Sequence, residues 1–334
     1  MASYFQSGMK LPHRRQFLHL AAGAAAFPAV SRIASAQAYP SRPVRIIVGV
    51  AAGSASDIAA RLMGQWLSER LGQPFVIENR VGAGGNVGTE MVVRSAPDGY
   101  TLLMVNGANA ISATLYAKLN FNFIRDIAPV ASVMRTSVVM EVHPSVPAKT
   151  VPEFIAYAKA NPGKIAMVSA GNGTIQHVTG ELFKMMAGID LLHVPYRGAP
   201  PALTDLIGGR AQVMFDVLPS SIEYIRANKL RALAVTTAAR SEMLPETPTV
   251  GEFVSGYEAS GWIGVGAPKA TPTEIVDNLN KEINVALLDP KIKARMSDLG
   301  SAVFASSPAE FTNFIAAETE KWGKVVNFAG IKAE

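Results

Sequence analysis

Short apolar runs alternate with stretches of helical spacing over the first third of the chain. Val44–Val48 is a β-rich run, followed by small residues and then by a helical pattern that starts at Asp57. Phe75–Ile77 and Thr101–Val105 predict two more strands, with a helix over about 86–94 between them. Because strands that alternate with helices form βαβ units, the pattern predicts an α/β fold with mostly parallel sheets.

The same alternation continues after residue 140. Further buried strands are expected at Ile165–Val168, Leu191–Val194, Val213–Phe215, Leu230–Val235 and Trp262–Gly266. Three helix starts are expected to carry a capping box, in which a hydroxyl and a carboxylate satisfy each other's free amides. These pairs are Thr150 with Glu153, Thr271 with Glu274 and Ser307 with Glu310.

Two strand-like runs are candidates for segments that cross between two lobes. They are Ser137–Val142 and Trp262–Ala267, and no long or low-complexity linker lies near them. We therefore expect a discontinuous first lobe of residues 39–139 plus 262–334, and a second lobe of residues 140–261.

Residues 1–38 are expected to be an export signal. Arg14-Arg15 precedes an apolar, Ala-rich stretch over 18–30, and Ala36-Gln37-Ala38 is a small-x-small cleavage signal. The paired arginines are typical of a twin-arginine signal. The alternative is an N-terminal anchor helix, but the apolar stretch is short of the ~20 residues that span a bilayer, and Pro28 interrupts it.

Charge and composition exclude several classes of protein. Removal of residues 1–38 takes away Lys10, Arg14, Arg15 and Arg32, so 31 basic residues become 27, against 26 acidic ones. The basic face that nucleic-acid binding needs is therefore absent from the mature chain. There are no cysteines, which excludes disulfides and thiolate sites, and the 49% hydrophobic content excludes general disorder.

Sequence motifs for catalysis or cofactor binding are scarce. No G-x-S-x-G, H-E-x-x-H or P-loop motif occurs, and the Gly-rich run from Gly82 has Val87 where a dinucleotide fingerprint needs glycine. After removal of residues 1–38 the chain has three histidines, His143, His177 and His193. None lies three or four residues from another, which is the spacing that two metal ligands on one helix would need. We expect no metal, no cofactor and no catalysis, although a serine–histidine hydrolase stays open because triads assemble in space.

Three loops of small residues open helices at the ends of predicted strands. They span 51–57, 82–88 and 170–174. Small residues expose backbone N–H groups, and a helix N-terminus adds about half a positive charge, so such loops can bind an anion without a lysine. Because ligands of open α/β sheets bind at the carboxyl ends of strands, we expect two of these loops to hold one carboxylate between the lobes.

The candidate ligand-binding residues lie in these loops and at other strand ends. The set is Gly53, Ser54, Ala55, Asp57, Gly84, Gly85, Asn86, Asn106, Gly173, Thr174, His177, Tyr196, Arg197 and Asp216. Several have a structural alternative: Asp57 and Thr174 as helix caps, His177 as a packing residue, Arg197 as an exposed surface residue. Asp216 ends an apolar strand, where its carboxylate is expected to accept from a ligand hydroxyl or amine.

Several runs of this chain resemble those of one known family. They are 39–48, the loop that ends in Asp57, 78–86, 97–103, 171–183, 193–198 and 208–216. In this order they are similar to the Bug family, the TctC-type substrate-binding proteins of tripartite tricarboxylate transporters. One departure lies in the first loop, where Gly49, Val50, Gly53 and Ser54 replace the family's usual Pro, Phe and Gly-Gly.

The resemblance implies a two-lobed, type II periplasmic-binding-protein fold with a ligand cleft between the lobes. It implies loops from both lobes that hold a ligand carboxylate, partly through ordered water. The expected function is capture of a small organic acid or amino acid in the periplasm, by a monomer that hands it to transporter membrane subunits. A receptor that reports its ligand to a membrane sensor is the alternative, and an exported hydrolase is a third.

Overall fold

The computed structural model describes residue 2 and residues 39–116 and 118–333. The described helices and strands all lie within residues 39–334. The expected export signal, with Arg14 and Arg15, falls outside the described residues. Among the helices of the described part, none combines the length and apolar character that crossing a membrane would take.

The first lobe is built on three parallel strands. β1 (Val44–Val48) lies between β2 (Phe75–Asn79) and β3 (Thr101–Asn106), with Val44 opposite Phe75 and Arg45 opposite Thr101. The helices of this region are α2 (Ala55–Leu71), the short η1 (Ala83–Gly85), α3 (Asn86–Val93), α4 (Gly107–Leu115) and α5 (Phe123–Asp126). The carboxyl ends of β1, β2 and β3 each lead into one of these helices.

The second lobe repeats this arrangement with different strands. β5 (Ala166–Ser169) lies between and parallel to β6 (Leu192–Pro195) and β7 (Val213–Val217), while β8 (Arg231–Val235) pairs with the crossing strand β4. The helices here are α6 (Val151–Ala160), α7 (Ile175–Ala187), α8 (Ala199–Ile207), α9 (Leu218–Arg226) and the short η2 (Val250–Glu252).

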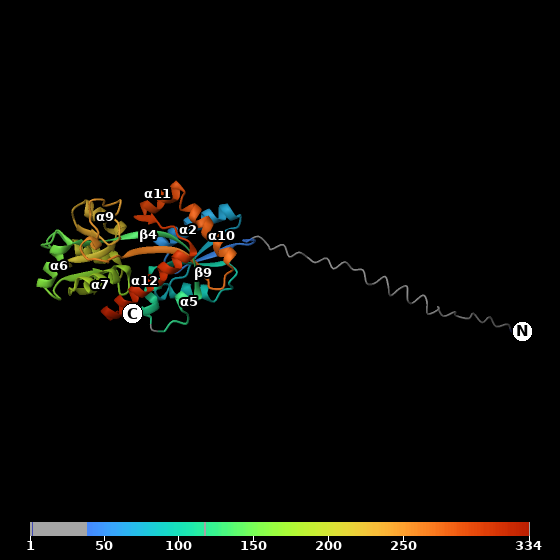
Figure 1. Ribbon diagram of the computed structural model, residues 1–334, viewed down its shortest axis with the longest axis horizontal. Helices are drawn as coiled ribbons and strands as arrows, with labels where there is room; N and C mark the ends of the chain where they lie inside the picture. Colours follow the sequence, from blue (N-terminus) through green and yellow to red (C-terminus); the bar gives the residue numbers. More distant parts are fainter. Residues whose placement is uncertain (1, 3–38, 117, 334) are drawn as a thin grey trace. The chain divides into compact units, whose positions relative to one another are not determined.

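Two long strands connect the lobes. β4 (Ile127–Val142) and β9 (Ser260–Pro268) run antiparallel, in a sheet of order β2-β1-β3-β9-β4-β7-β5-β6, and β4 also pairs with β10 (Ser301–Val303). Figure 1 shows β4 and β9 between the helices of the two lobes. The sheets are therefore mixed, because a chain that crosses to the other lobe and returns must run in opposite directions. The parallel strand pairs of the described residues are all between short strands of one lobe.

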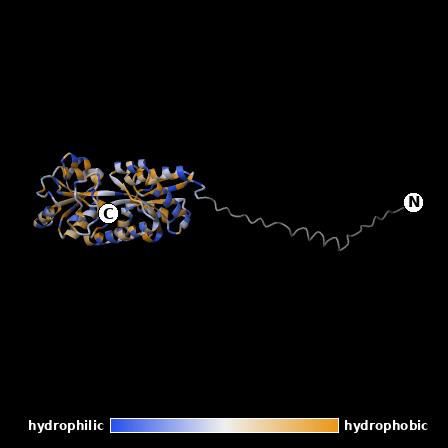
Figure 2. Ribbon diagram, turned by 45° about the horizontal axis from the view of Figure 1, so that its top comes forward, coloured by the Kyte–Doolittle hydropathy of each residue, from blue (hydrophilic) through white to orange (hydrophobic). Residues whose placement is uncertain are grey.

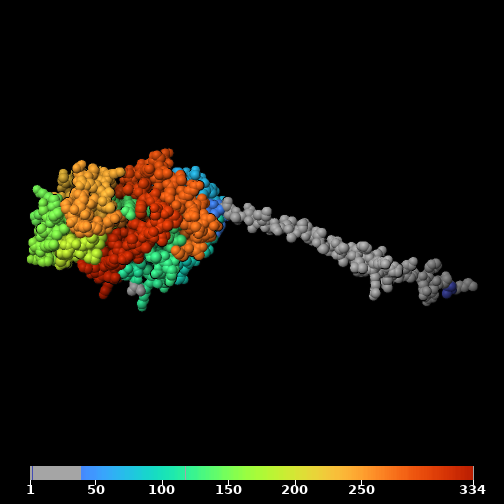
Figure 3. All heavy atoms as spheres, viewed as in Figure 1, coloured from blue at the N-terminus to red at the C-terminus, as the bar shows by residue number. Residues whose placement is uncertain are grey.

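The C-terminal part of the chain packs back across both lobes. It comprises α10 (Thr273–Ala286), α11 (Pro290–Asp298) and α12 (Pro308–Ala329). α12 packs on α4 of the first lobe, on β4 and on α7 of the second lobe. In Figure 3 its red atoms lie across the same face as the yellow-green atoms of the second lobe. α12 therefore contacts the core of both lobes.

Hydrophobic residues gather along the strands, much of whose ribbon is orange in Figure 2, and many of them are fully buried. One core cluster contains Phe154, Phe183 and Phe215 of the second lobe together with Phe311 and Trp322 of α12. A second cluster lies around β1, α2 and α10 of the first lobe. The first cluster also includes β1 and β3 residues, so apolar packing is continuous from one lobe to the other.

The expected strands all form, with bounds shifted or extended by a few residues. Of the three expected capping boxes, that of Ser307 and Glu310 is complete, and Thr150 accepts from the amide of Glu153. The expectation for Thr271 is wrong: α10 begins after Pro272, and the Thr271 hydroxyl donates to the Pro268 carbonyl instead. Proline has no backbone N–H to donate to a carboxylate, so Pro272 at the cap position cannot complete a capping box.

Candidate functional site

Three strand ends of the first lobe meet at one edge of its sheet. The Asn79 side chain donates to the Val50 carbonyl at 3.0 Å, which joins the ends of β1 and β2. The Asn106 side chain donates to Ser56 Oγ at 3.3 Å, which joins the starts of α4 and α2. A Cβ on Gly49 would lie 2.9 Å from the Gly85 Cα, so the first two loops touch through their backbones. The sequence-predicted loops 51–57 and 82–88 are therefore neighbours.

Asp57 is an internal anchor of this edge. Its carboxylate is 2% exposed and accepts from the Gly53 amide, from Arg61 and from Asn79, at 2.9–3.1 Å. The hydrogen bond from Arg61 is the largest cause that lowers its pKa. Both of its oxygens thus accept hydrogen bonds within the chain, which favours the structural alternative over a direct ligand contact. The Gly53 amide is likewise occupied, because it donates to Asp57.

The start of α2 keeps two amides without a partner. Ser54 caps the helix by accepting from the Asp57 amide, and the Ser54 amide itself donates to the Ala51 carbonyl at 3.3 Å. The amides of Ala55 and Ser56 have no acceptor among the described residues. These are the first two positions of the helix, where free N–H groups and the helix dipole favour an anion.

The loop that opens α7 has the same construction. Thr174 caps the helix by accepting from the His177 amide, and its own amide donates to the Gly171 carbonyl. The Gly173 amide donates to His177 Nδ1 at 3.1 Å. The amides of Ile175 and Gln176 have no acceptor in the described part of the chain. The Gly173 amide is therefore occupied within the chain, and the free amides of this loop lie two and three residues further on, at Ile175 and Gln176.

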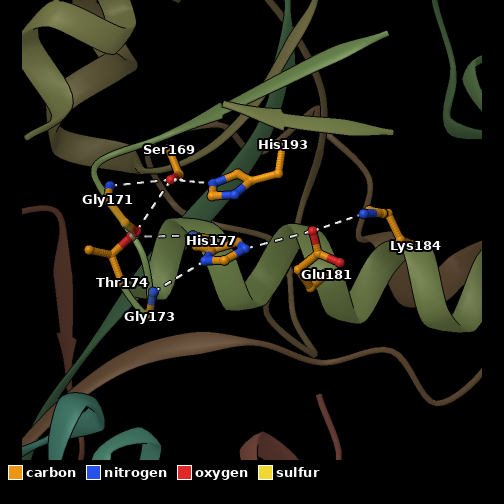
Figure 4. Close-up of polar contacts among 8 residues, drawn as sticks. All are labelled: Ser169, Gly171, Gly173, Thr174, His177, Glu181, Lys184 and His193. Atoms are coloured by element: carbon orange, nitrogen blue, oxygen red, sulfur yellow. Dashed lines mark hydrogen bonds and ion pairs between the residues drawn. The ribbon is translucent and has the colours of Figure 1, made fainter. Parts of the chain in front are cut away.

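His177 belongs to a polar network along α7, drawn in Figure 4. Its ring stacks on His193 with centroids 3.6 Å apart, and its Nε2 lies 3.7 Å from Glu181, which also bonds Lys184 at 2.9 Å. His193 Nε2 lies 2.7 Å from Ser169 Oγ. Burial and the neighbouring His177 lower the pKa of His193 to about 4, so this imidazole is neutral at pH 7.

Asp216 lies inside the second lobe and not at the ligand edge. Its carboxylate is fully buried and accepts from Gln176, from the Val217 amide and from Ser221. Ser221 also donates to the buried Glu141, and burial raises the pKa of both carboxyls. These bonds favour a structural role for Asp216 over the expected ligand contact, because its bond from Gln176 holds the first turn of α7.

The other predicted residues have varied surroundings. The Tyr196 hydroxyl donates to Asp205 at 2.5 Å, which raises the pKa of Tyr196 and directs this side chain toward α8. Arg197 is exposed and forms no ion pair within the described residues. Asn86 is buried, and its Nδ2 has no acceptor there. Among these three, Asn86 and Arg197 keep donors for a ligand.

Sequence reasoning missed two residues at the end of α4. A Cβ on Gly173 would lie 2.4 Å from Leu115 Cδ2, so the first lobe touches the α7 loop of the second lobe at this point. A Cβ on Gly84 would lie 3.2 Å from the Tyr116 hydroxyl. Leu115 and Tyr116 sit in an ordinary amphipathic pattern, and only the packing of α4 between the lobes reveals their place.

Two pockets lie in the described part of the chain. One, of about 630 Å³, is lined by Asn172 and His177 at the start of α7, by Glu181 and Lys184 further along that helix, by His193 and by the segment that follows α12. The other, of about 590 Å³, lies between Arg135 of β4, the loop 237–243 and α11. No group of three histidine or acidic side chains in the described part of the chain is arranged to hold a metal ion.

Comparisons with known proteins identify the family. Residues 59–331 match the profile described as "Tripartite tricarboxylate transporter family receptor". The chain belongs to this receptor family. Protein BugT of Bordetella pertussis is 35% identical over 303 residues, 89% of this chain and 92% of BugT.

Two solved structures resemble the chain over most of its length. The structure of R. palustris Rpa4515 with adipate is 35% identical, with a TM-score of 0.74, and covers 88% of this chain and 99% of its own. That of MatC from Rhodopseudomonas palustris with bound malate is 30% identical, with a TM-score of 0.70, covering 86% and 100%. The two-lobed binding-protein fold and the resemblance inferred from the sequence are thus confirmed.

Membership of a receptor family argues against the alternative that the chain is a hydrolase. The hydrogen-bonded pair Ser169 and His193 has the distance that a serine nucleophile and its base would need. Ser169 is, however, fully buried, and its hydroxyl also contacts the backbone of Gly171. The related proteins are periplasmic solute-binding proteins and not enzymes, and this chain is one of that family.

Proposed function

We propose that the chain is a periplasmic receptor for a small dicarboxylate, which it binds between the starts of α2 and α7. The free amides of Ala55 and Ser56 in one lobe, and of Ile175 and Gln176 in the other, are the observation that carries the proposal. Each pair offers two donors at the positive end of a helix. Relatives with adipate and with malate support the choice of ligand class.

Proline substitutions test the amide donors without loss of the helices. Ala55 and Ile175 are the first residues of their helices, where proline is tolerated because its φ fits and the N–H is not used by the helix. The residues before them, Ser54 and Thr174, have ψ of 162° and 160°, which a following proline accepts. Ala55→Pro therefore removes one N–H and little else, whereas Ile175→Pro also removes an isoleucine side chain that packs against the core, so its folding is checked separately.

We expect Ala55→Pro and Ile175→Pro each to weaken binding of adipate or malate about tenfold to a hundredfold. Loss of a hydrogen bond to a charged group costs about 1.5–3 kcal/mol. Calorimetry on protein stripped of ligand by unfolding and refolding measures the change. Thr273→Pro, at the first position of α10, is the matched control and should bind as the parent does. Normal binding by both cleft variants, with folding intact, would overturn the proposal.

Export and delivery complete the proposed role. We propose that residues 1–38 direct the chain to the twin-arginine pathway, and that the lobes comprise 39–139 plus 262–334, and 140–261. The protein then acts as a monomer that presents its ligand to transporter membrane subunits. Arg14→Lys with Arg15→Lys should leave the precursor in the cytoplasm, as fractionation would show. Pull-down of a membrane sensor in place of the transporter would favour the signalling alternative.

A further inference from the structure

Two acidic side chains of the second lobe, Glu141 of β4 and Asp216 of β7, are buried beside the same hydroxyl group. Glu141, Asp216 and Ser221 of α9 are all completely buried. The Ser221 Oγ lies 2.7 Å from Glu141 Oε1 and 3.2 Å from Asp216 Oδ2. Ser221 therefore links two carboxyl groups that come from paired strands, and Glu141 has no part in the dicarboxylate site proposed above.

No cation neutralises this pair in the described part of the chain. Burial is the largest influence on both carboxyl groups, and their other interactions are with Ser221, Gln176, the Val217 amide and each other. Charged side chains of the surrounding elements have other partners. They are Glu223 with Arg226 on α9, Asp205 with Arg210 beside α8, His177 with Glu181 on α7, and Arg231 of β8 with the carbonyls of Val146 and Ala148. Ionisation of both acids would thus leave two uncompensated charges in the protein interior, which is strongly unfavourable.

The hydrogen-bond donors around the two acids differ in number. Asp216 Oδ1 accepts from the Gln176 side chain at 3.2 Å and from the Val217 amide at 2.8 Å, and its Oδ2 faces Ser221. Glu141 faces only Ser221, because its Oε2 has no partner among the described residues. A hydroxyl group has one hydrogen, so Ser221 donates to one carboxyl group and accepts from the other. The carboxyl group that donates to Ser221 must be protonated.

We propose that Glu141 is protonated in the folded receptor at pH 7 and that Asp216 is ionised. The Glu141 O–H then donates to Ser221, and the Ser221 O–H donates to Asp216, which receives three hydrogen bonds in all. The reverse assignment would place the charge on Glu141, where one donor and no cation are present. Burial and the neighbouring Asp216 charge both raise the pKa of Glu141, in agreement with this assignment.

The proton gives Glu141 a positioning role in the proposed dicarboxylate site, and this part of the inference rests on that proposed function. Asp216 holds the Gln176 side chain, and the Gln176 amide is one of the free donors at the start of α7. With Glu141 neutral, the Ser221 hydrogen remains available to Asp216, and one negative charge lies behind the anion site instead of two. Glu141 thus acts through Ser221 and Asp216, without contact with the ligand.

Infrared spectroscopy of residues 39–334 at pH 7 tests the position of the proton. An un-ionised carboxylic acid has a C=O stretching band apart from those of carboxylates and amides, and ordinary acidic side chains are ionised at this pH. We expect such a band in the parent, its loss in Glu141→Gln and its retention in Asp216→Asn. Glu282→Gln changes a buried glutamate that is paired with Arg70, so this matched control should keep the band.

Three infrared results would overturn the assignment. They are a parent without the band, a band that survives in Glu141→Gln, and loss of the band in Asp216→Asn with folding intact. Near-ultraviolet circular dichroism of each variant shows whether it is folded.

Urea unfolding at pH 5, 6 and 7 provides a second test that depends neither on a ligand nor on Asp216→Asn. The folded state keeps the Glu141 proton, whereas the unfolded chain releases it above its ordinary pKa of about 4.5. The unfolded state then binds fewer protons, so the contribution of Glu141 to stability falls as pH rises. The unfolding equilibrium constant of the parent, divided by that of Glu141→Gln, should rise about tenfold per pH unit. A ratio that stays constant from pH 5 to 7 would contradict a protonated Glu141.

Calorimetry with adipate tests the positioning role. Glu141→Gln keeps a donor to Ser221 and should bind adipate within about threefold of the parent. Asp216→Asn has one acceptor oxygen for three donors, so it should weaken binding about tenfold or more. Equal loss of affinity in the two variants, with folding intact, would contradict the role of Glu141 as a neutral donor. A parent that binds no dicarboxylate would overturn the proposed function and the positioning role together, and the infrared band would still show where the proton lies.

Discussion

At the scale of single residues, the predicted polar residues are of two kinds. Some are hydrogen-bonded within the chain and hold its structure, and others have N–H donors without an acceptor in the described part of the chain. Asp57 and Asp216 are buried and hydrogen-bonded within the chain, whereas Asn86 and Arg197 keep donors. The structure places Asp57 and Asn86 in the first turns of α2 and α3, Asp216 in β7 and Arg197 just after β6. The sequence could not assign their roles, because a carboxylate at a strand end looks the same whether it faces a ligand or a neighbouring helix. Only contacts from residues distant in sequence, such as Asn79 with Asp57, separate the two cases.

The neutral imidazole of His193 makes stability depend on pH. Its pKa is about 4 in the fold and about 6.5 in the unfolded chain, so between these values the unfolded state binds more protons. Stability should therefore fall as pH falls from about 6.5 to 4. After allowance for partial solvent screening, the loss from this residue should be about 2 kcal/mol.

Urea unfolding of the parent and of His193→Asn, at several pH values from 7 to 4.5, measures this effect. The difference in unfolding free energy between the two proteins should shrink toward acid pH, because the variant lacks the titrating ring. Carboxylates titrate in both proteins, so their contributions to the unfolding free energy cancel in the difference. A difference that stays constant over this range would contradict the assignment of the acid sensitivity to His193.

At the scale of elements, the apolar pattern was sufficient to predict strands and helices but not their directions. β1 occupies the predicted residues, because a short β-branched run between turns is a strong local signal. β4 extends from Ile127 to Val142, about ten residues before the predicted crossing run. The part of β4 before the predicted run contains Pro129, Ser132, Arg135 and Thr136, and its pairing with β9 and β10 overrides their weak preference for a strand.

Glu318 fixes α12 to the crossing strand β9. Its Oε2 accepts from the indoles of Trp262 in β9 and Trp322 in α12, both at 2.9 Å, while Lys321 pairs with Oε1. Glu318→Leu should lower the free energy of unfolding by about 2–4 kcal/mol, because two buried indole N–H groups lose their acceptor. Chemical denaturation with tryptophan fluorescence measures it. Glu320→Leu, exposed on the same helix, should change stability far less.

At the scale of the whole molecule, the contact between Leu115 and Gly173 is where one lobe limits the approach of the other. Gly173 has φ of +70°, and a Cβ there would lie 2.4 Å from Leu115 Cδ2. A methyl group at this position should therefore hold the lobes apart as well as strain the backbone. Neither effect is visible in the sequence, where this glycine is one of several in a loop.

Gly173→Ala should weaken dicarboxylate binding, and Leu115→Ala added to it should restore part of the affinity. The strain from φ persists in the double variant at about 1 kcal/mol, so the rescue should be incomplete. Calorimetry on the parent, both single variants and the double variant gives the coupling between the two positions. Additive effects of the two substitutions would show that the contact plays no part in closure.

The single strand β4 also has a consequence for how the molecule comes apart. Residues 127–137 of β4 pair with β9, and residues 138–142 pair with β7 of the second lobe. Apolar side chains of α12 join the cores of the two lobes. Unfolding of either lobe therefore removes hydrogen-bond partners from β4, which is also part of the sheet of the other lobe. Loss of order in one lobe should thus propagate into the other, so that the two melt as one cooperative unit and leave no half-folded receptor for proteases to attack.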